Sequence, residues 1–329
     1  MILDSLQLGT AFKLMLRTLP IIGIRLGASI LFWIALLIYL AIAGWVAYLV
    51  GNAIQIVGVI LFIVALVAII PIYNLVYHYV FYLLKAAHVA IIAELLVNGN
   101  VPGGQSQIAW GKQKVQERFG EVSGMFIIDE LVMGVVRAFT RTVFMLTAWL
   151  PGDTLRTAVS IINRVIEYAM NYIDEAVLAR SFWNESESVW TNARDGVVLY
   201  AMVWKPILKN AVALMILSFV PFVIAFIILA APIGLLLART SPQIAGWSII
   251  ATLVLAYLIK VAVGDAFAMT AIIATYQRET QNLTPDPSMV AKLDSISDKF
   301  KNLKQRAEES IGQFAKKPAN DKPMADAPI

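Results

Sequence analysis

Long apolar runs dominate the first hundred residues of the chain. Residues 26–50 contain no charged side chain, and a second run, residues 53–97, follows after a short Gly-Asn turn. A bilayer core is spanned by about 20 apolar residues in a helix. The first run therefore predicts one span. The second predicts a span that kinks at Pro71, where a backbone donor is missing, and then continues outside the membrane as an amphipathic helix.

Two more runs, residues 211–238 and 244–276, predict spans in the second half of the chain. Between the two pairs of runs lie residues 124–150 and 153–182, which are long enough to cross a membrane as helices but carry several charges. If both cross, the chain has six spans. If neither crosses, four spans remain, with a cytoplasmic helical domain between them. We predict an all-α, polytopic helical membrane protein with about six spans, and keep the four-span arrangement as the alternative.

Polar segments divide the chain into three parts. Residues 1–25 predict an amphipathic N-terminal segment, and residues 26–278 a transmembrane helical bundle whose central part, residues 99–208, is polar. Residues 279–329 predict a cytoplasmic amphipathic helix and a disordered tail. Apolar side chains in steps of three or four form one stripe along this helix: Val290, Leu293, Ile296, Phe300, Leu303, Ala307, Ile311 and Phe314.

Composition agrees with a membrane protein and narrows the chemistry. Of 329 residues, 59% are hydrophobic and 15% are charged, whereas soluble domains are about half apolar and a quarter charged. Cysteine is absent, which excludes disulfides and thiolate chemistry. The two histidines, His78 and His88, do not have a helical metal-binding spacing, and no phosphate-binding loop or nucleophile elbow occurs. We therefore expect no cofactor, no metal and no enzyme activity.

Lysine and arginine predict the orientation of the chain. Positive charge concentrates on the cytoplasmic side of spans, and here it recurs on one side of the predicted turns, at Lys13, Arg17, Arg25, Lys112, Lys114, Arg118, Arg194, Lys205 and Lys209. The opposite connections hold only Arg156 and Arg239. We expect a multi-pass protein of the cytoplasmic (inner) membrane with both termini cytoplasmic. The net charge of +4 then indicates contact with the lipid bilayer and its anionic lipids, and no nucleic acid.

Charged side chains recur at helical spacing in both of the doubtful helices. Steps of seven and four residues put them on one face: Glu130, Arg137 and Arg141 with Asp129 beside them, then Arg164, Asn171 and Glu175 with Glu167 and Asp174 nearby. Opposite charges of two antiparallel helices would pair along a polar seam; unpaired, each costs at least about 2.5–3.5 kcal/mol at mid-membrane. The seam is a path for a substrate, a structural network, or two solvated helix faces.

The last apolar run raises the same question at Lys260 and Asp265. Five residues separate them, so their side chains diverge by about 140° on an ideal α-helix. This geometry predicts no direct pair and favours partners on other helices. Gly264, next to Asp265, would allow a close neighbouring backbone, a bend or a ligand.

One stretch carries a family resemblance. In NYIDEAVLARSFWNESESVWTNARDGVVL, an Asn-Tyr pair enters a polar helix, an Asn follows about a dozen residues later, and Ala-Arg-Asp opens the next helix: Asn171, Tyr172, Asn184, Ala193, Arg194 and Asp195. In this block, and in AYLI and YQRETQN of the last span, the chain resembles the C-terminal half of the choline transporter-like family, from about residue 85 to residue 281. The resemblance implies a helical permease for choline or ethanolamine-like cations.

Two hypotheses about function follow. The first is a membrane permease for a small organic cation or a related polar solute, with a substrate path along Glu130, Glu167, Asn171, Asp174, Glu175 and Asp265, held by Arg137, Arg141, Arg164 and Lys260. The second is a non-transporting membrane scaffold or interaction protein. Its terminal amphipathic helices would bind the anionic leaflet, and the C-terminal helix would contact a protein partner or a second copy of the chain. An oligomeric channel is a third option.

Overall fold

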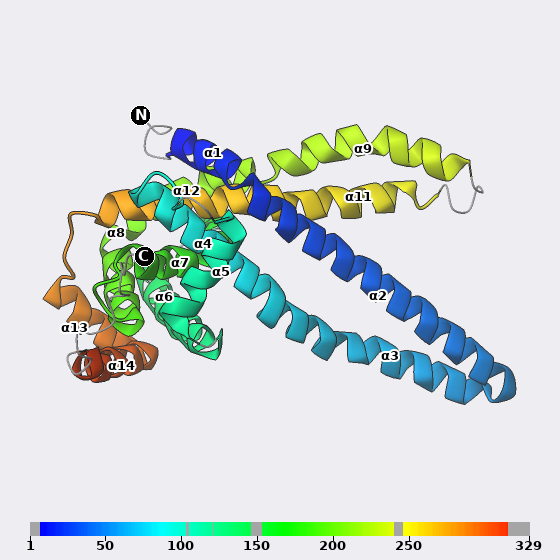
Figure 1. Ribbon diagram of the computed structural model, residues 1–329, viewed down its shortest axis with the longest axis horizontal. Helices are drawn as coiled ribbons and strands as arrows, with labels where there is room; N and C mark the ends of the chain where they lie inside the picture. The colour runs from blue at the N-terminus through cyan, green and yellow to red at the C-terminus, as the bar shows by residue number, and fades with distance from the viewer. Residues whose placement is uncertain (1–6, 103–104, 121, 146–152, 240–245, 315–329) are drawn as a thin grey trace, which may run out of the picture.

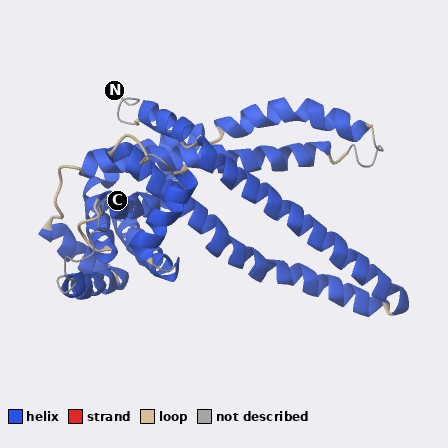
Figure 2. Ribbon diagram, viewed as in Figure 1, coloured by secondary structure: helices blue, strands red, loops and turns tan. Residues whose placement is uncertain are grey.

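A computed structural model describes residues 7–102, 105–120, 122–145, 153–239 and 246–314. Every regular element in these ranges is a helix (Figure 2). The prediction of an all-α chain is confirmed.

Two long helical hairpins project from one side of the molecule (Figure 1). The first consists of α2 (Leu19–Ala53) and α3 (Gln55–Val76), and the second of α9 (Val220–Ala238) and α11 (Ser248–Ile259). Within each hairpin the two helices pack against one another. The hairpins touch near their base and diverge toward their tips.

The hairpins belong to four helices that are long and apolar enough to cross a membrane. Most hairpin side chains are exposed and apolar, such as Leu37 at 64% and Ile228 at 63%. This is the surface expected when lipid is the solvent, because helices satisfy their backbone hydrogen bonds internally and present apolar side chains outward. In the described part of the chain, the four candidate spans are residues 19–53, 55–97, 189–238 and 248–280.

The remaining helices form a compact group, here called the helical body. It contains α4 (Tyr82–Val97), α5 (Gln107–Phe119), α6 (Val122–Met145), α7 (Asp153–Trp183), α8 (Val189–Leu217) and α12 (Asp265–Thr280). Its core is one cluster of side chains that includes Ile91, Ile92, Met125, Ile173, Leu199, Ile207, Met269 and Tyr276. The two charged helices that the six-span count requires, α6 and α7, pack inside this body.

Two terminal segments complete the body. The C-terminal stripe is split between α13 (Pro287–Ile296) and α14 (Asp298–Phe314), so the prediction of one continuous helix is wrong. Ser297 is extended, with φ −144° and ψ 112°, and its hydroxyl accepts a hydrogen bond from the backbone N–H of Phe300 at 3.3 Å. This is the geometry of a helix N-cap. The stripe packs on α6 and α8, with Leu293, Phe300, Leu303 and Ala307 fully buried.

At the other end of the chain, α1 (Leu8–Arg17) packs against α12. Its inner face buries Ala11 and Leu14, while Phe12 and Leu16 remain exposed on the outer face. A helix is therefore present within the predicted N-terminal segment. Its outer face is apolar immediately before the first hairpin begins.

Close backbone contact holds the tip of the first hairpin. Ile54, in an extended conformation, separates α2 from α3. Gly58 is the only buried residue within α3. A Cβ at this position would lie 2.5 Å from the carbonyl oxygen of Ala47 and 2.6 Å from Cα of Gly51. Only glycine leaves space for this approach of the two helices.

Substitution of Gly58 should separate the helices of the first hairpin. The added methyl group in Gly58→Ala overlaps backbone atoms of α2, and such overpacking costs about 1–3 kcal/mol. Gly27→Ala, on α2 with no atom within 4 Å of the added Cβ, is the matched control and should be neutral or slightly stabilising. Thermal unfolding of both variants in detergent, followed by circular dichroism, tests this. Equal midpoints would contradict it.

Candidate functional site

Charged side chains gather where the hairpins join the helical body. We call this group the central polar cluster. It comprises Arg25, Lys85, His88, Asp129, Tyr172, Asp174, Glu175, Lys260 and Asp265, which come from α2, α4, α6, α7 and the join of α11 to α12.

Lys260 and Asp265 form a direct ion pair, contrary to the prediction. The Lys260 Nζ donates to Asp265 Oδ1 at 2.6 Å. The reason is a π-helical turn, η3 (Lys260–Gly264), in which the backbone N–H of Asp265 donates to the carbonyl oxygen of Lys260. A π turn closes its hydrogen bond between residues i and i+5, so residues five apart lie one above the other instead of diverging.

Gly264 permits this turn by making room for a neighbouring backbone. A Cβ on Gly264 would lie 2.0 Å from the carbonyl oxygen of Ser218, the residue that follows the last residue of α8. Of the three roles expected for Gly264, close approach of another backbone is the one observed. The Lys260 ammonium also lies 5.1 Å from the ring centroid of Phe219, a cation–π contact. The pair is thus held against the start of the second hairpin.

The helical body contacts the same pair through tyrosine. The hydroxyl of Tyr172 on α7 donates to Asp265 Oδ1 at 2.9 Å. One turn earlier, the Tyr168 hydroxyl donates to the carbonyl oxygen of Leu214 at 3.2 Å, and the two rings are 5.2 Å apart. A single carboxylate, Asp265, therefore connects the base of the second hairpin to α7.

A second pair connects the first hairpin to the body. Nη1 of Arg25, on α2, lies 3.0 Å from Nδ1 of His88 on α4. A guanidinium only donates hydrogen bonds, so Nδ1 accepts and His88 carries its proton on Nε2. His88 is fully buried. Arg25 also interacts electrostatically with Asp265, which joins the two contacts into one group.

The third part of the cluster is a small acidic cavity between α4, α6 and α7. Lys85 pairs with Glu175, and Asp129 is hydrogen-bonded to Asp174. These four residues line a cavity of about 10 Å³, which is close to the minimum volume for one water molecule. Burial, followed by the neighbouring Asp174, raises the pKa of Asp129 to about 8. Burial also raises the pKa of Asp174.

The structure brings together only some of the residues predicted from the sequence. Asp174, Glu175, Lys260 and Asp265 all lie in the central polar cluster. The others with described side chains lie on exposed helix faces outside it: Glu130, Arg137, Arg141, Arg164 and Glu167. The Asn171 side chain is outside the described part of the chain.

Glu130 shows why helix-face reasoning placed these residues incorrectly. It points away from α7 and accepts a hydrogen bond from Lys299 of α14 at 2.6 Å. The predicted seam between α6 and α7 therefore does not contain Glu130. Its sequence neighbour Asp129 is the α6 carboxylate that faces α7.

Several cluster members were missed by sequence reasoning. Arg25 was assigned only a topological role, and Lys85 and His88 were placed on an amphipathic surface. Two signals were available. Arg25 is the one charge in the sequence of α2, and Lys85 and His88 are three residues apart within an otherwise apolar stretch, so they share a helix face.

The block that carries the family resemblance has a local structural role. Arg118 of α5 donates to a backbone carbonyl oxygen in the last turn of α7, that of Ser181 at 2.7 Å, and to one in the turn after it, that of Glu187 at 3.0 Å. Asn184 and Asn192 are hydrogen-bonded to each other at 3.0 Å. These contacts fix the turn between α7 and α8.

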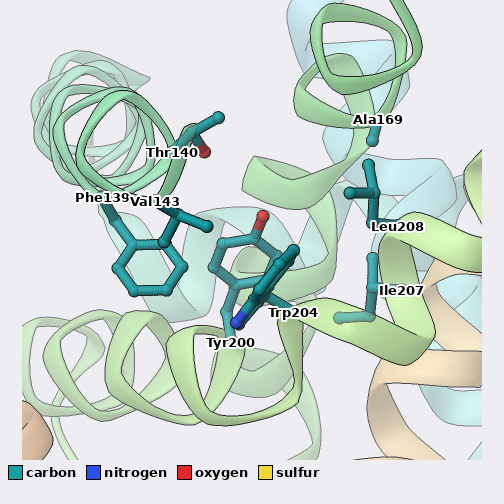
Figure 3. Close-up of a pocket in the computed structure, with 8 residues that line it drawn as sticks. All are labelled: Phe139, Thr140, Val143, Ala169, Tyr200, Trp204, Ile207 and Leu208. Atoms are coloured by element: carbon teal, nitrogen blue, oxygen red, sulfur yellow. The ribbon is translucent and has the colours of Figure 1, made fainter. Parts of the chain in front are cut away.

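Two other hollows lie in the body. One, of about 10 Å³, is lined mainly by apolar side chains beside the kink of α8 at Val203, with the rings of Tyr200 and Trp204 turned into it (Figure 3). The other is an open surface groove of about 560 Å³ near Arg194. Its charges are internally paired, Arg194 with Asp195 and Lys304 with Asp294. Neither hollow presents an unsatisfied set of catalytic groups.

Comparison of the chain with protein-family models, curated proteins and solved structures finds no match. The resemblance to the choline transporter-like family stays a prediction. In the described residues, no group of three or more His, Asp or Glu side chains is placed to hold a metal ion.

Removal of one charge of the Lys260–Asp265 pair should destabilise the fold much more than removal of both charges. Asp265→Asn leaves a buried ammonium without its counter-ion, and loss of one partner costs about 3–5 kcal/mol. The double variant Lys260→Met/Asp265→Asn removes both charges and should recover most of this loss. A double-mutant cycle on the free energy of unfolding measures the coupling. The exposed pair Glu130 and Lys299 is the control, with no measurable coupling expected. Equal coupling in the two cycles would refute the prediction.

Proposed function

We propose that the chain is a membrane-anchored helical scaffold. Its two apolar hairpins cross the membrane four times and hold the helical body at the cytoplasmic face, with both termini cytoplasmic. This is the four-span alternative of the sequence analysis. The observation that carries it is the separation of charge from the apolar surface. The described hairpin residues 26–53, 55–76, 220–238 and 248–259 contain no charged side chain, whereas the central polar cluster lies at their base.

The distribution of positive charge supports the orientation. Lys13 and Arg17 belong to α1, and Lys112 and Lys114 to α5. Both helices lie near the base of the hairpins (Figure 1). The tips carry little charge: Arg239 follows α9 directly. By the positive-inside rule, the body then faces the cytoplasm of a cell bounded by an inner membrane.

The amphipathic N-terminal helix supports contact with the membrane surface. The exposed Phe12 and Leu16 lie on α1, one turn or two before the first hairpin begins at Leu19. Lys13 on the same helix is exposed. An apolar face beside basic residues favours the interface of a bilayer that contains anionic lipids. The apolar stripe of α13 and α14 is already covered by α6 and α8. A protein partner that binds these two C-terminal helices would therefore contact their polar face.

Single cysteines test the four-span arrangement directly, because the chain has none. Ile54→Cys lies at the tip of the first hairpin, while Arg141→Cys and Glu167→Cys lie on exposed faces of α6 and α7. A membrane-impermeant maleimide should label position 54 from outside intact cells, and positions 141 and 167 only after the inner face is opened. Resistance of 141 and 167 to labelling on both sides would instead support six spans.

A permease for a small organic cation is the second candidate, and the acidic cavity favours it. Asp129, Asp174 and Glu175 supply negative potential beside a single lysine, Lys85. Desolvated carboxylates of this kind attract cations and commonly mark transport pathways in membrane proteins. The cavity itself has room for about one water molecule, so passage of a solute would require an opening between α4, α6 and α7.

Uptake of labelled choline into liposomes that contain the purified chain tests the second candidate. If it is a permease, uptake should be saturable, lost in Glu175→Gln, and retained in the exposed control Glu130→Gln. The scaffold proposal instead expects uptake equal to that of empty liposomes. Equal loss in both variants would indicate damage to the fold instead of a substrate path.

A further inference from the structure

The carboxyl groups of Asp129 and Asp174 meet across the interface between α6 and α7. Both side chains line the same small cavity, and a hydrogen bond joins the two carboxyl groups. An ionised carboxylate only accepts hydrogen bonds. This contact therefore requires one proton shared by the pair, whatever the remaining surroundings.

The charges around the pair lead to the same requirement. Among the described residues of the central polar cluster, three cations face four carboxylates: Arg25, Lys85 and Lys260 against Asp129, Asp174, Glu175 and Asp265. Arg25 and Lys260 are engaged with His88 and Asp265, and Lys85 with Glu175. One added proton on the aspartate pair makes the cluster electrically neutral.

Titratable groups surround the pair on the neighbouring helical segments. Lys85 and Tyr82 face it from α4, Glu175 from α7, and Tyr77 from η2 (Tyr77–Phe81). Arg137, on α6, also interacts with it. Arg137 is exposed, and its backbone lies eight residues, about 12 Å at 1.5 Å per residue, farther along α6 than Asp129.

Two polar atoms of the cavity are without a hydrogen-bond partner of their own among the described residues. Asp174 Oδ1 and the Tyr82 hydroxyl are buried in the cavity, and neither has a hydrogen-bond partner within the described part of the chain. The ordinary pKa of an aspartate is 3.8, and that of Asp129 lies near 8. The proton is consequently bound at neutral pH and leaves as the pH rises through about 8.

We propose that Asp129 and Asp174 form a proton-binding site that controls how firmly α6 is held against α4 and α7. With the proton bound, the pair is a hydrogen bond across the interface. Without it, two like charges line one small cavity, and the single lysine of that cavity, Lys85, is already paired with Glu175. This site goes beyond the proposed anchoring function and does not depend on it.

Infrared spectroscopy of the full chain in liposomes detects the proton directly. A protonated carboxyl has a C=O stretching band that moves on deuterium exchange. We expect this band at pH 6, its loss near pH 8, and its absence from both Asp129→Asn and Asp174→Asn. The exposed neighbour variant Glu130→Gln should keep it, as should Asp129→Glu, which retains the acid.

Three infrared results would overturn the proposal. These are absence of the band from the wild type at pH 6, its retention in either asparagine variant, and its loss in Glu130→Gln. If a metal cation instead of a proton neutralises Asp129 and Asp174, the band is absent from the wild type at pH 6. Circular dichroism of each variant establishes that it is folded before the spectra are compared.

The effect on α6 is measured with a pair of spin labels. Ile127→Cys, on the exposed side of α6, and Glu167→Cys, on α7, provide sites in a chain without other cysteines. Their distance distribution should broaden when the pH is raised from 6 to 9, and should stay narrow in the Asp129→Asn background. A distribution that is independent of pH in the wild type would refute control of α6 by the proton.

Discussion

Neutralisation of charge at the base of the hairpins is the constraint on which this structure depends. A charge removed from water costs several kcal/mol unless a partner and hydrogen bonds replace the solvent. Here each hairpin enters the body with a charge at its base, Arg25 on one and Lys260 on the other. The carboxylate of Asp265 pairs with Lys260, accepts from Tyr172 and acts electrostatically on Arg25, which also donates to the neutral imidazole of His88. Correct docking of the hairpins is therefore coupled to correct assembly of the body.

The two parts of the molecule are stabilised by different forces. Lipid is as apolar as the hairpin side chains, so close backbone packing, as at Gly58, must hold those helices together. The body instead has a continuous core of buried apolar side chains. The C-terminal helices α13 and α14 contribute Phe300 and Leu303 to it. Removal of that segment would uncover the core, which makes its deletion a test of folding more than of partner binding.

Much of the architecture could be predicted because it depends on composition and period. Runs of apolar residues identified the hairpins, and steps of three and four residues identified the buried face of the C-terminal segment. The site was less predictable. Ideal helical geometry assigned Lys260 and Asp265 to different faces, since a π turn has no composition signature. Ideal helical geometry also led to Glu130 instead of Asp129 as the residue of the seam. Two adjacent residues differ by about 100° around a helix, and only the packing of α6 decides which one faces α7.

The π turns η2 and η3 occupy equivalent places, each at the join between a hairpin helix and a body helix. A π turn accommodates one residue more than the α-helical turn that it replaces, and one residue is worth about 100° of rotation. Each extra residue thus resets the phase of the helix where the hairpin joins the body. The exposed apolar pattern of the hairpin helix and the core-facing pattern of the body helix can then vary independently. A single-residue insertion or deletion at either join would turn the body helix to a different face.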